Sequence, residues 1–392
     1  MSTLTQHIIL KKNEERRLLH GHQWIFSNEI HRVEGSPTSG DVVEILRSNG
    51  TSLGIGFYNP HSLIAVRFLS PHVETIDTQF FLTRFNSAYA LRKKLFPASG
   101  TFRLVHSESD FLPGLIIDKY EELLSIQTFS AGMDRRLDII CDTLEALFHP
   151  KGIVERNESP LRTLEHLPLR KGVLRGTAPP TIVELNGLKF SVDIVNGQKS
   201  GFFLDQRENR MLLKPFASGA RVLDCFSNEG GFGLYAAAFG ASSVDCVDIS
   251  EEANLRAKEN AALNNLHTLQ FHTADAFKFL HNNVTQQRKW DIVILDPPSF
   301  TKSKKNIPAA IKGYKEINTY GLKLVSPNGI FLTASCSHHI DKETFLNIVS
   351  ESSVKANRKI KLLYFSGASP DHPVLPSMPE TQYLKCALFS VE

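Results

Sequence analysis

From about residue 219 onward, short apolar runs alternate with segments of helical periodicity, and this alternation constrains the fold more than any other feature of the chain. The segments ARVLDCF, SVDCVDIS, LQFHTADAF, KWDIVILDPP and GIFLTASCS read as strands. Helices are expected over GFGLYAAAFG and EEANLRAKENAALNNL, the second with Ser250 as its N-cap. Strands separated by helices form a parallel, doubly wound sheet, whose ligands bind beyond the carboxyl ends of the strands.

Residues 1–72 read instead as a small β-rich domain, with short strands at 41–46, 53–58 and 63–69 between turn-forming residues.

Residues 73–195 read as a mixed α+β linking domain. Its expected elements are a helix over 80–96, strands near 114–118 and 123–129, and a helix over 133–148. The domain ends in two alternating runs around Asn186-Gly187, the strongest short signal for a hairpin turn. The last domain is then residues 196–392, and the whole chain is of the α/β class.

Length and composition fit this division, because 392 residues exceed what one compact core usually holds. A net charge of +3 permits a nucleic-acid partner without requiring one. The five cysteines are scattered and form no CxxC pair, which argues against a structural zinc site and for free thiols. With no signal peptide or membrane-spanning run in the sequence, we expect a cytoplasmic protein that binds no metal and no membrane.

Two acids end the first two strands of the C-terminal domain. Asp224 precedes the turn Asn228-Glu229-Gly230-Gly231-Phe232-Gly233, whose glycines allow a ligand close to the backbone but lack the GxGxxG spacing of dinucleotide sites. Asp248 stands where an acid can accept hydrogen bonds from ribose hydroxyls, although exposed acids at strand ends are common.

The run Asp296-Pro297-Pro298-Ser299-Phe300 follows the apolar strand 292–295, the fourth strand expected in this domain. Two prolines stiffen the loop, so that Asp296 and Phe300 are held at the sheet edge. An aromatic ring there can stack on an extruded base, and the alternative is a rigid loop with a surface phenylalanine.

Cys336, in Ser335-Cys336-Ser337, follows the next strand. A cysteine at a strand end is more often a small buried apolar residue than a nucleophile. In the functional interpretation its thiolate adds to carbon 6 of a pyrimidine, which makes carbon 5 electron-rich enough to accept a methyl group. Core packing is expected for the other four cysteines.

Lysines crowd the segment after the DPPSF run, and either a solvated face or phosphate contact explains them. Lys302, Lys304 and Lys305 are the candidates for contact with RNA.

The runs NGQKSGFFLDQRENR, VLDCFSNEGGFG, DPPSF and ASCSHH together resemble the RlmI-like family of rRNA cytosine-5 methyltransferases, over essentially the whole chain. The resemblance implies an N-terminal PUA RNA-binding domain, a linking domain with a β-hairpin, and a class I, Rossmann-like methyltransferase domain that uses S-adenosylmethionine. It also implies that the DPPSF strand lies between the VLDCF and SCS strands, and that the partner is RNA; a homodimer is compatible with it.

By the same resemblance, Cys336 and Asp296 are the expected catalytic residues, and Gln206 and Arg207 are candidates for the methionine carboxylate of the cofactor. Asp275 matches the acid that meets the adenine amine. The expected cofactor site comprises Gln206, Arg207, Asp224, Phe226, Asn228, Gly230, Asp248, Asp275 and Asp296. The chain departs from its relatives at Asn228-Glu229, which leaves the role of Glu229 open.

These residues predict formation of 5-methylcytidine in large-subunit rRNA through a Cys336 adduct. Three alternatives stay open at this stage: methylation of a guanine or an exocyclic amine, a non-catalytic RNA-binding assembly factor, and a nicotinamide dehydrogenase. Methylation of an amine needs no covalent cysteine, so Cys336 argues against it. The presence of Asp248, Asp296 and Cys336 together argues against a non-catalytic factor. The glycine spacing argues against a dehydrogenase.

Overall fold

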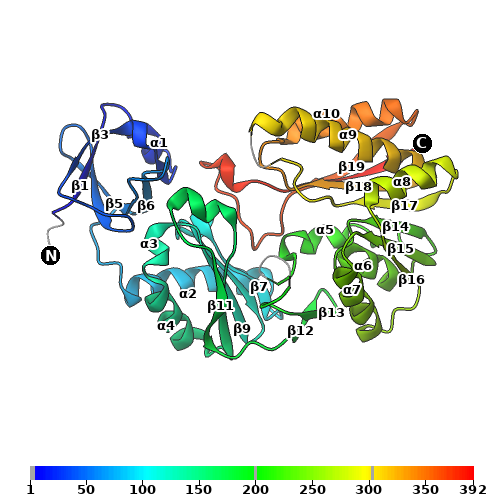
Figure 1. Ribbon diagram of the computed structural model, residues 1–392, viewed down its shortest axis with the longest axis horizontal. Helices are drawn as coiled ribbons and strands as arrows, with labels where there is room; N and C mark the ends of the chain where they lie inside the picture. The colour runs from blue at the N-terminus through cyan, green and yellow to red at the C-terminus, as the bar shows by residue number, and fades with distance from the viewer. Residues whose placement is uncertain (1–4, 198–200, 302–303) are drawn as a thin grey trace. The chain divides into compact units, whose positions relative to one another are not determined.

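The computed structural model describes residues 5–197, 201–301 and 304–392 (Figure 1). The chain forms two compact units. The first comprises Met1–Val183, Val192–Phe202 and Pro370–Thr381, and the second comprises Glu184–Ser191, Phe203–Ser369 and Gln382–Glu392. Among the described residues, no helix combines the length and apolar character needed to cross a membrane.

The N-terminal part of the first unit is a six-stranded sheet in the order β2-β6-β5-β4-β1-β3. Three of its strands fall where the alternating pattern predicted them, and three were not predicted, because they are very short or mostly exposed and carry little apolar periodicity. The elements are β1 (His7–Leu10), α1 (Arg16–Leu19), β2 (Trp24–Ile25), η1 (Ser27–Glu29), β3 (Ile30–Glu34), β4 (Val42–Leu46), β5 (Ser52–Tyr58) and β6 (Val66–Ser70).

The rest of the first unit is a five-stranded sheet in the order β11-β10-β9-β8-β7, with a core that includes Phe81 and Phe85 from α2. The helix predicted over 133–148 is interrupted near Arg136, so two helices replace one. The elements are α2 (Thr78–Leu95), β7 (Thr101–His106), η2 (Ser107–Asp110), β8 (Leu115–Tyr120), β9 (Leu123–Thr128), α3 (Ala131–Asp134), α4 (Leu137–Phe148), β10 (Gly152–Asn157), η3 (Pro160–Glu165) and β11 (Arg170–Gly176).

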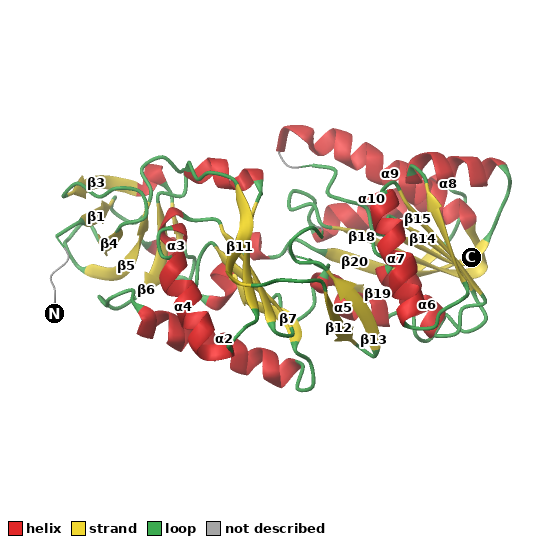
Figure 2. Ribbon diagram, turned by 60° about the horizontal axis from the view of Figure 1, so that its bottom comes forward, coloured by secondary structure: helices red, strands yellow, loops and turns green. Residues whose placement is uncertain are grey.

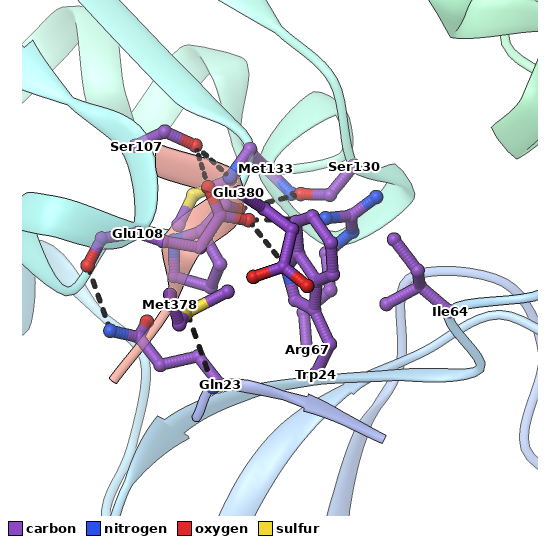
Figure 3. A network of polar contacts seen from close by, with 12 residues as sticks. Gln23, Trp24, Ile64, Arg67, Ser107, Glu108, Ser130, Met133, Met378 and Glu380 are labelled. Atoms are coloured by element: carbon purple, nitrogen blue, oxygen red, sulfur yellow. Dashed lines mark hydrogen bonds and ion pairs between the residues drawn. The ribbon is translucent and has the colours of Figure 1, made fainter. Parts of the chain in front are cut away.

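Buried charges join these two sheets within the first unit (Figure 3). Arg67, on β6, pairs with Glu108 of η2 at 3.1 Å and with Glu165 of η3 at 3.0 Å. The indole Nε1 of Trp24 donates to the same Glu108 carboxylate at 2.8 Å. Because all three charged side chains are nearly buried, the two carboxylates depend on Arg67 to balance their charge.

The predicted hairpin is present as β12 (Thr181–Leu185) and β13 (Leu188–Val192). Asn186 and Gly187 have φ values of 46° and 87°, the left-handed pair that a two-residue hairpin turn requires.

The second unit contains a seven-stranded sheet in the order β16-β15-β14-β17-β18-β20-β19, and this confirms the predicted doubly wound α/β class (Figure 2). β17 lies between β14 and β18, as the family resemblance implied, and β20 runs antiparallel to both β18 and β19. Alternate residues of β14 enter separate cores on the two sheet faces, with Leu223 and Cys225 in one and Val222 in the other.

One predicted strand was too long, because β16 ends at Thr273 and the ADAF run instead begins a helix capped by Asp275. The strands are β14 (Arg221–Cys225), β15 (Ser243–Asp248), β16 (Leu269–Thr273), β17 (Trp290–Leu295), β18 (Val325–Ser335), β19 (Ile360–Ser366) and β20 (Lys385–Val391). The helices are η4 (Leu204–Gln206), α5 (Arg207–Met211), α6 (Gly231–Ala238), α7 (Glu251–Leu263), α8 (Ala276–Thr285), η5 (Lys304–Asn306), α9 (Ile307–Leu324) and α10 (Lys342–Lys355). The short helix η6 (Pro379–Thr381) belongs to the first unit.

The buried pairs of Arg67 predict a large stability effect. Arg67→Met should lower the free energy of unfolding of the first unit by about 3–5 kcal/mol, because two buried carboxylates lose their partner. Arg32→Met is the control, since its pair with Glu34 is largely exposed and should be worth less than about 1 kcal/mol. Urea unfolding followed by Trp24 fluorescence in a Trp290→Phe background measures both, and equal effects would contradict the prediction.

Candidate active site

The candidate site lies at the carboxyl ends of four neighbouring parallel strands of the second unit. Asp224 and Asp248 stand at the ends of β14 and β15, and Asp296 and Cys336 directly follow β17 and β18. Parallel strands place their carboxyl ends at one edge of the sheet, so four residues far apart in the sequence share this edge.

The turn after β14 is held to the end of β15 by Asp248. One carboxylate oxygen of Asp248 accepts the backbone N–H of Asn228 at 2.9 Å, and the other accepts that of Ser250, also at 2.9 Å. Phe226 and Asn228 have φ values of 63° and 50°, a conformation that costs energy for residues other than glycine. Asp248 therefore fixes a strained loop, and its partly exposed carboxylate keeps lone pairs for a ligand.

Close packing explains two of the glycines in this segment. A Cβ at Gly231 would lie 2.9 Å from the Nε of Arg210, and one at Gly233 would lie 2.5 Å from the sulfur of Cys246. Gly230 needs glycine for its φ of 81°. Glu229, whose role the sequence left open, is buried and accepts a hydrogen bond from Arg256 Nε at 2.6 Å.

Asp224 is buried and incompletely paired. Its Oδ2 accepts the N–H of Gly233 at 2.8 Å, whereas its Oδ1 has no hydrogen-bond partner in the described part of the chain. Burial raises the pKa of Asp224 to about 8. A buried acceptor without a donor is costly unless a ligand supplies one.

Asp296 ends a chain of polar side chains. Gln206 Nε2 donates to Asp296 Oδ1 at 2.9 Å, and Asn209 Nδ2 donates to Gln206 Oε1 at 2.6 Å. Ser366, on β19, donates to Asn209 Oδ1 at 2.6 Å. These contacts orient the Asp296 carboxylate. Neither Asn209 nor Ser366 was predicted, because no motif marks them in the sequence.

The two residues of the DQR run that were predicted to hold the methionine carboxylate, Gln206 and Arg207, are directed to different places. Gln206 reaches Asp296, but the Nε of Arg207 donates to Asn186 Oδ1 in the hairpin turn at 3.0 Å. Arg210, one helical turn on, is the arginine within electrostatic reach of Asp205, Asp224 and Asp296, and burial lowers its pKa. The role of Arg207 in holding the methionine carboxylate stays a prediction, and Arg210 is a second arginine of the same helix that lies near the acids.

The Phe300 ring anchors the DPPSF loop. It lies 4.5 Å from the Tyr314 ring of α9 and 5.8 Å from the Phe277 ring of α8, measured between centroids. Phe277 in turn contacts Phe226 edge-on at 6.4 Å. Any stacking on a substrate base must use the part of Phe300 that these neighbours leave exposed.

Four hydroxyl groups connect the loops after β17 and β18. The Tyr314 hydroxyl lies 3.0 Å from Ser335 Oγ and 2.9 Å from Ser337 Oγ, and Ser337 Oγ lies 3.0 Å from Ser299 Oγ. Cys336, between two of these serines, is partly exposed, whereas the other four cysteines are buried.

The remaining predicted residues lie as follows. One oxygen of Asp275 accepts the N–H of Lys278 and caps α8. Lys302 lies outside the described residues, the backbone of Lys304 begins η5, and Lys305 is exposed. Ile249 was not predicted as a site residue. It follows Asp248 and is 72% exposed, and an exposed apolar side chain in a polar loop suits packing against a flat ring.

This arrangement fits S-adenosylmethionine. The buried Asp224 Oδ1, which accepts no hydrogen bond from the residues that the structure describes, suits an ammonium group. Asp248 suits ribose hydroxyls, and the exposed Ile249 suits a purine. The fold and this edge define a class I methyltransferase.

Comparisons with known proteins agree. A family model described as a PUA-like domain matches residues 8–71, and one described as S-adenosylmethionine-dependent methyltransferase matches residues 176–390. Ribosomal RNA large subunit methyltransferase I of Aeromonas salmonicida is 41% identical over 96% of this chain and 97% of its own length, and that of Shewanella frigidimarina is 40% identical over the same shares. A putative methyltransferase structure complexed with S-adenosylhomocysteine is 21% identical, with a TM-score of 0.85 over 98% of this chain and 99% of its own, and shows the shared fold.

The chain therefore belongs to the ribosomal RNA large subunit methyltransferase I family and is an S-adenosylmethionine-dependent methyltransferase with an N-terminal PUA-like domain.

The raised pKa of Asp224 predicts pH-dependent cofactor binding. Below pH 8 the acid is protonated in the free protein, so pairing with a cationic cofactor requires loss of that proton. Affinity for S-adenosylmethionine should rise up to about tenfold per unit between pH 5.5 and 7, where the cofactor amine stays charged. Asp224→Asn should bind more weakly and remove the slope, as calorimetry can show. A slope unchanged in the variant would place the titrating group elsewhere.

Proposed function

We propose that this protein transfers a methyl group from S-adenosylmethionine to carbon 5 of a cytosine in large-subunit rRNA, through a transient bond between Cys336 and carbon 6. The observation that carries the proposal is the setting of Cys336. Its partly exposed thiol follows β18, in a loop that hydroxyl groups tie to the loop bearing Asp296. The other four cysteines are buried.

Carbon 5 of cytosine is a weak nucleophile until carbon 6 carries an electron-rich substituent. Addition of the Cys336 thiolate to carbon 6 supplies it. In this proposal Asp296, oriented by Gln206, hydrogen-bonds the ring edge and favours protonation of the ring nitrogen. The bound cofactor supplies the methyl group as an electrophile. Loss of the carbon 5 proton to a base then expels Cys336 and restores the ring.

The proposed substrate follows from the relatives, whose names state that they act on large-subunit ribosomal RNA. The PUA-like domain supports an RNA partner. The target base must be unpaired or extruded, because side chains cannot read the deep groove of A-form RNA. A cytoplasmic location and a homodimer stay predictions.

Methylation of a guanine or an exocyclic amine is the alternative that also fits a DPP-aromatic loop. It needs no covalent cysteine, so Cys336 discriminates between the two reactions. A non-catalytic assembly factor and a dehydrogenase do not agree with the family to which the chain belongs.

Replacing the proposed nucleophile tests the reaction. The substrate is rRNA isolated from cells that lack the protein. Cys336→Ala should form no 5-methylcytidine in this rRNA, because no positioning effect replaces the covalent step. The variant should still bind S-adenosylmethionine. Mass spectrometry of digested rRNA measures the product. The control, Cys225→Ala, removes a core thiol and should still methylate. Methylation by Cys336→Ala near the wild-type rate would favour the amine alternative.

Surface charge on the PUA-like domain offers a second test. Deleting residues 1–70 is unsuitable, because Glu108 and Glu165 would lose Arg67. Lys12 and Arg16 are exposed, and changing both to Glu should weaken RNA binding and flatten its salt dependence, since fewer counterions are released. Exchanging the exposed Lys214 and Lys258 for Glu makes the same charge change elsewhere. If both double variants lost RNA affinity equally, the PUA-like domain would have no particular role in binding RNA.

A further inference from the structure

Lys385 is a buried amine that contacts the loop of the candidate nucleophile. It begins β20 and is 3% exposed, although lysines are almost never fully buried unless they are paired. Its Nζ donates to the carbonyl oxygens of Ser337 and Tyr383, each at 2.7 Å. An ammonium group has three N–H donors, and these carbonyls take two of them.

The strand register explains why Lys385 reaches the loop of Cys336. β20 pairs antiparallel with β18, and Lys385 stands opposite Ser335, the residue before Cys336. The hydrogen bond from Lys385 ends on Ser337, the residue after Cys336. The lysine thus holds the loop from both sides of the cysteine, through the sheet and through its side chain.

The charged groups around Lys385 come from one loop and one helix cap. Cys336 and Asp341 act to raise the pKa of Lys385, whereas burial, the larger effect, lowers it to about 8. Burial and the charge of Lys385 lower the pKa of His338. On the other side of the cysteine, the charge of Cys336 acts on the Tyr314 hydroxyl. The amine can therefore exchange a proton near neutral pH.

We propose that Lys385 is a positioning residue that sets the charge state of Cys336, by taking the thiol proton and keeping it as an ammonium while the thiolate adds to the pyrimidine. The S–H bond breaks, an N–H bond forms, and no electrons are exchanged with another reagent. The ion pair has the same net charge as the neutral pair. When Cys336 leaves carbon 6 it returns to the ammonium as thiolate, and the carbon 5 proton goes to a separate base. This role rests on the proposed function.

The pH profile of Cys336 alkylation tests the proposal without RNA or cofactor. Iodoacetamide reacts with the thiolate, and mass spectrometry of the Cys336 peptide follows this site alone. In the wild-type protein the profile should give an apparent pKa clearly below the ordinary 8.5 or so of a free cysteine. Lys385→Met should move that pKa up by at least about one unit and slow alkylation at pH 7 about tenfold.

Lys361→Met is the matched control, because Lys361 lies on the neighbouring strand β19 with 69% of its side chain exposed. It should leave the profile unchanged. S-adenosylmethionine binding by each variant reports whether the second unit is folded, and the wild-type profile needs no variant at all. An ordinary or raised pKa in the wild-type protein, or an unshifted profile in folded Lys385→Met, would overturn the proposal.

Failure of this proposal is distinguishable from failure of the proposed function. If Cys336→Ala abolishes methylation but the alkylation profile does not depend on Lys385, the nucleophile stands and the lysine is only structural. If Cys336→Ala still methylates, the covalent reaction fails whatever the profile shows.

Discussion

The hydroxyl group of Ser337 joins the two loops on which the proposed chemistry depends. It lies within 3.0 Å of Ser299, from the loop after β17, and 2.9 Å from Tyr314, which α9 buries against the sheet. Asp296 and Cys336 are separated by 40 residues of chain, so their relative placement must come from such contacts. Buried hydroxyl groups without partners are costly, and the chain of four is therefore stable only when both loops are in place.

The charged side chains at the carboxyl-end edge of the second unit's sheet form an acidic group and a basic group. Asp224, Asp248 and Asp296 gather where a cationic cofactor would bind, with the Arg210 guanidinium among them. Lys385 lies at the other end of the edge, under the cysteine loop. A cofactor that carries positive charge favours the ionised form of the acids, whereas a thiolate favours the ammonium form of the lysine. The two parts of the site thus suit opposite charges.

The strands and most helices of the second unit could be predicted from the sequence because their signals are local, whereas the place of β17 between β14 and β18 came from the family resemblance. A few consecutive residues are enough to predict an apolar strand, the Ser250 cap or the Asn186-Gly187 turn. Arg210 could not be singled out from the sequence, because which arginine of a short helix comes near the acids depends on the direction in which that helix enters. Lys385 gave no signal, because its importance arises from pairing with a strand 50 residues away in sequence. The strands β1, β2 and β3 were not predicted, because their sequences show little alternation of apolar and polar residues.

The central claim is that Cys336 bonds to carbon 6 of a cytosine, and RNA carrying 5-fluorocytidine tests it most directly. Fluorine at carbon 5 prevents the final elimination, so the bond between enzyme and RNA persists. The account predicts a wild-type complex that survives a denaturing gel, requires S-adenosylmethionine, and yields a cross-linked peptide containing Cys336. Absence of such a complex under conditions where ordinary RNA is methylated, or an equal yield from Cys336→Ala, would contradict it.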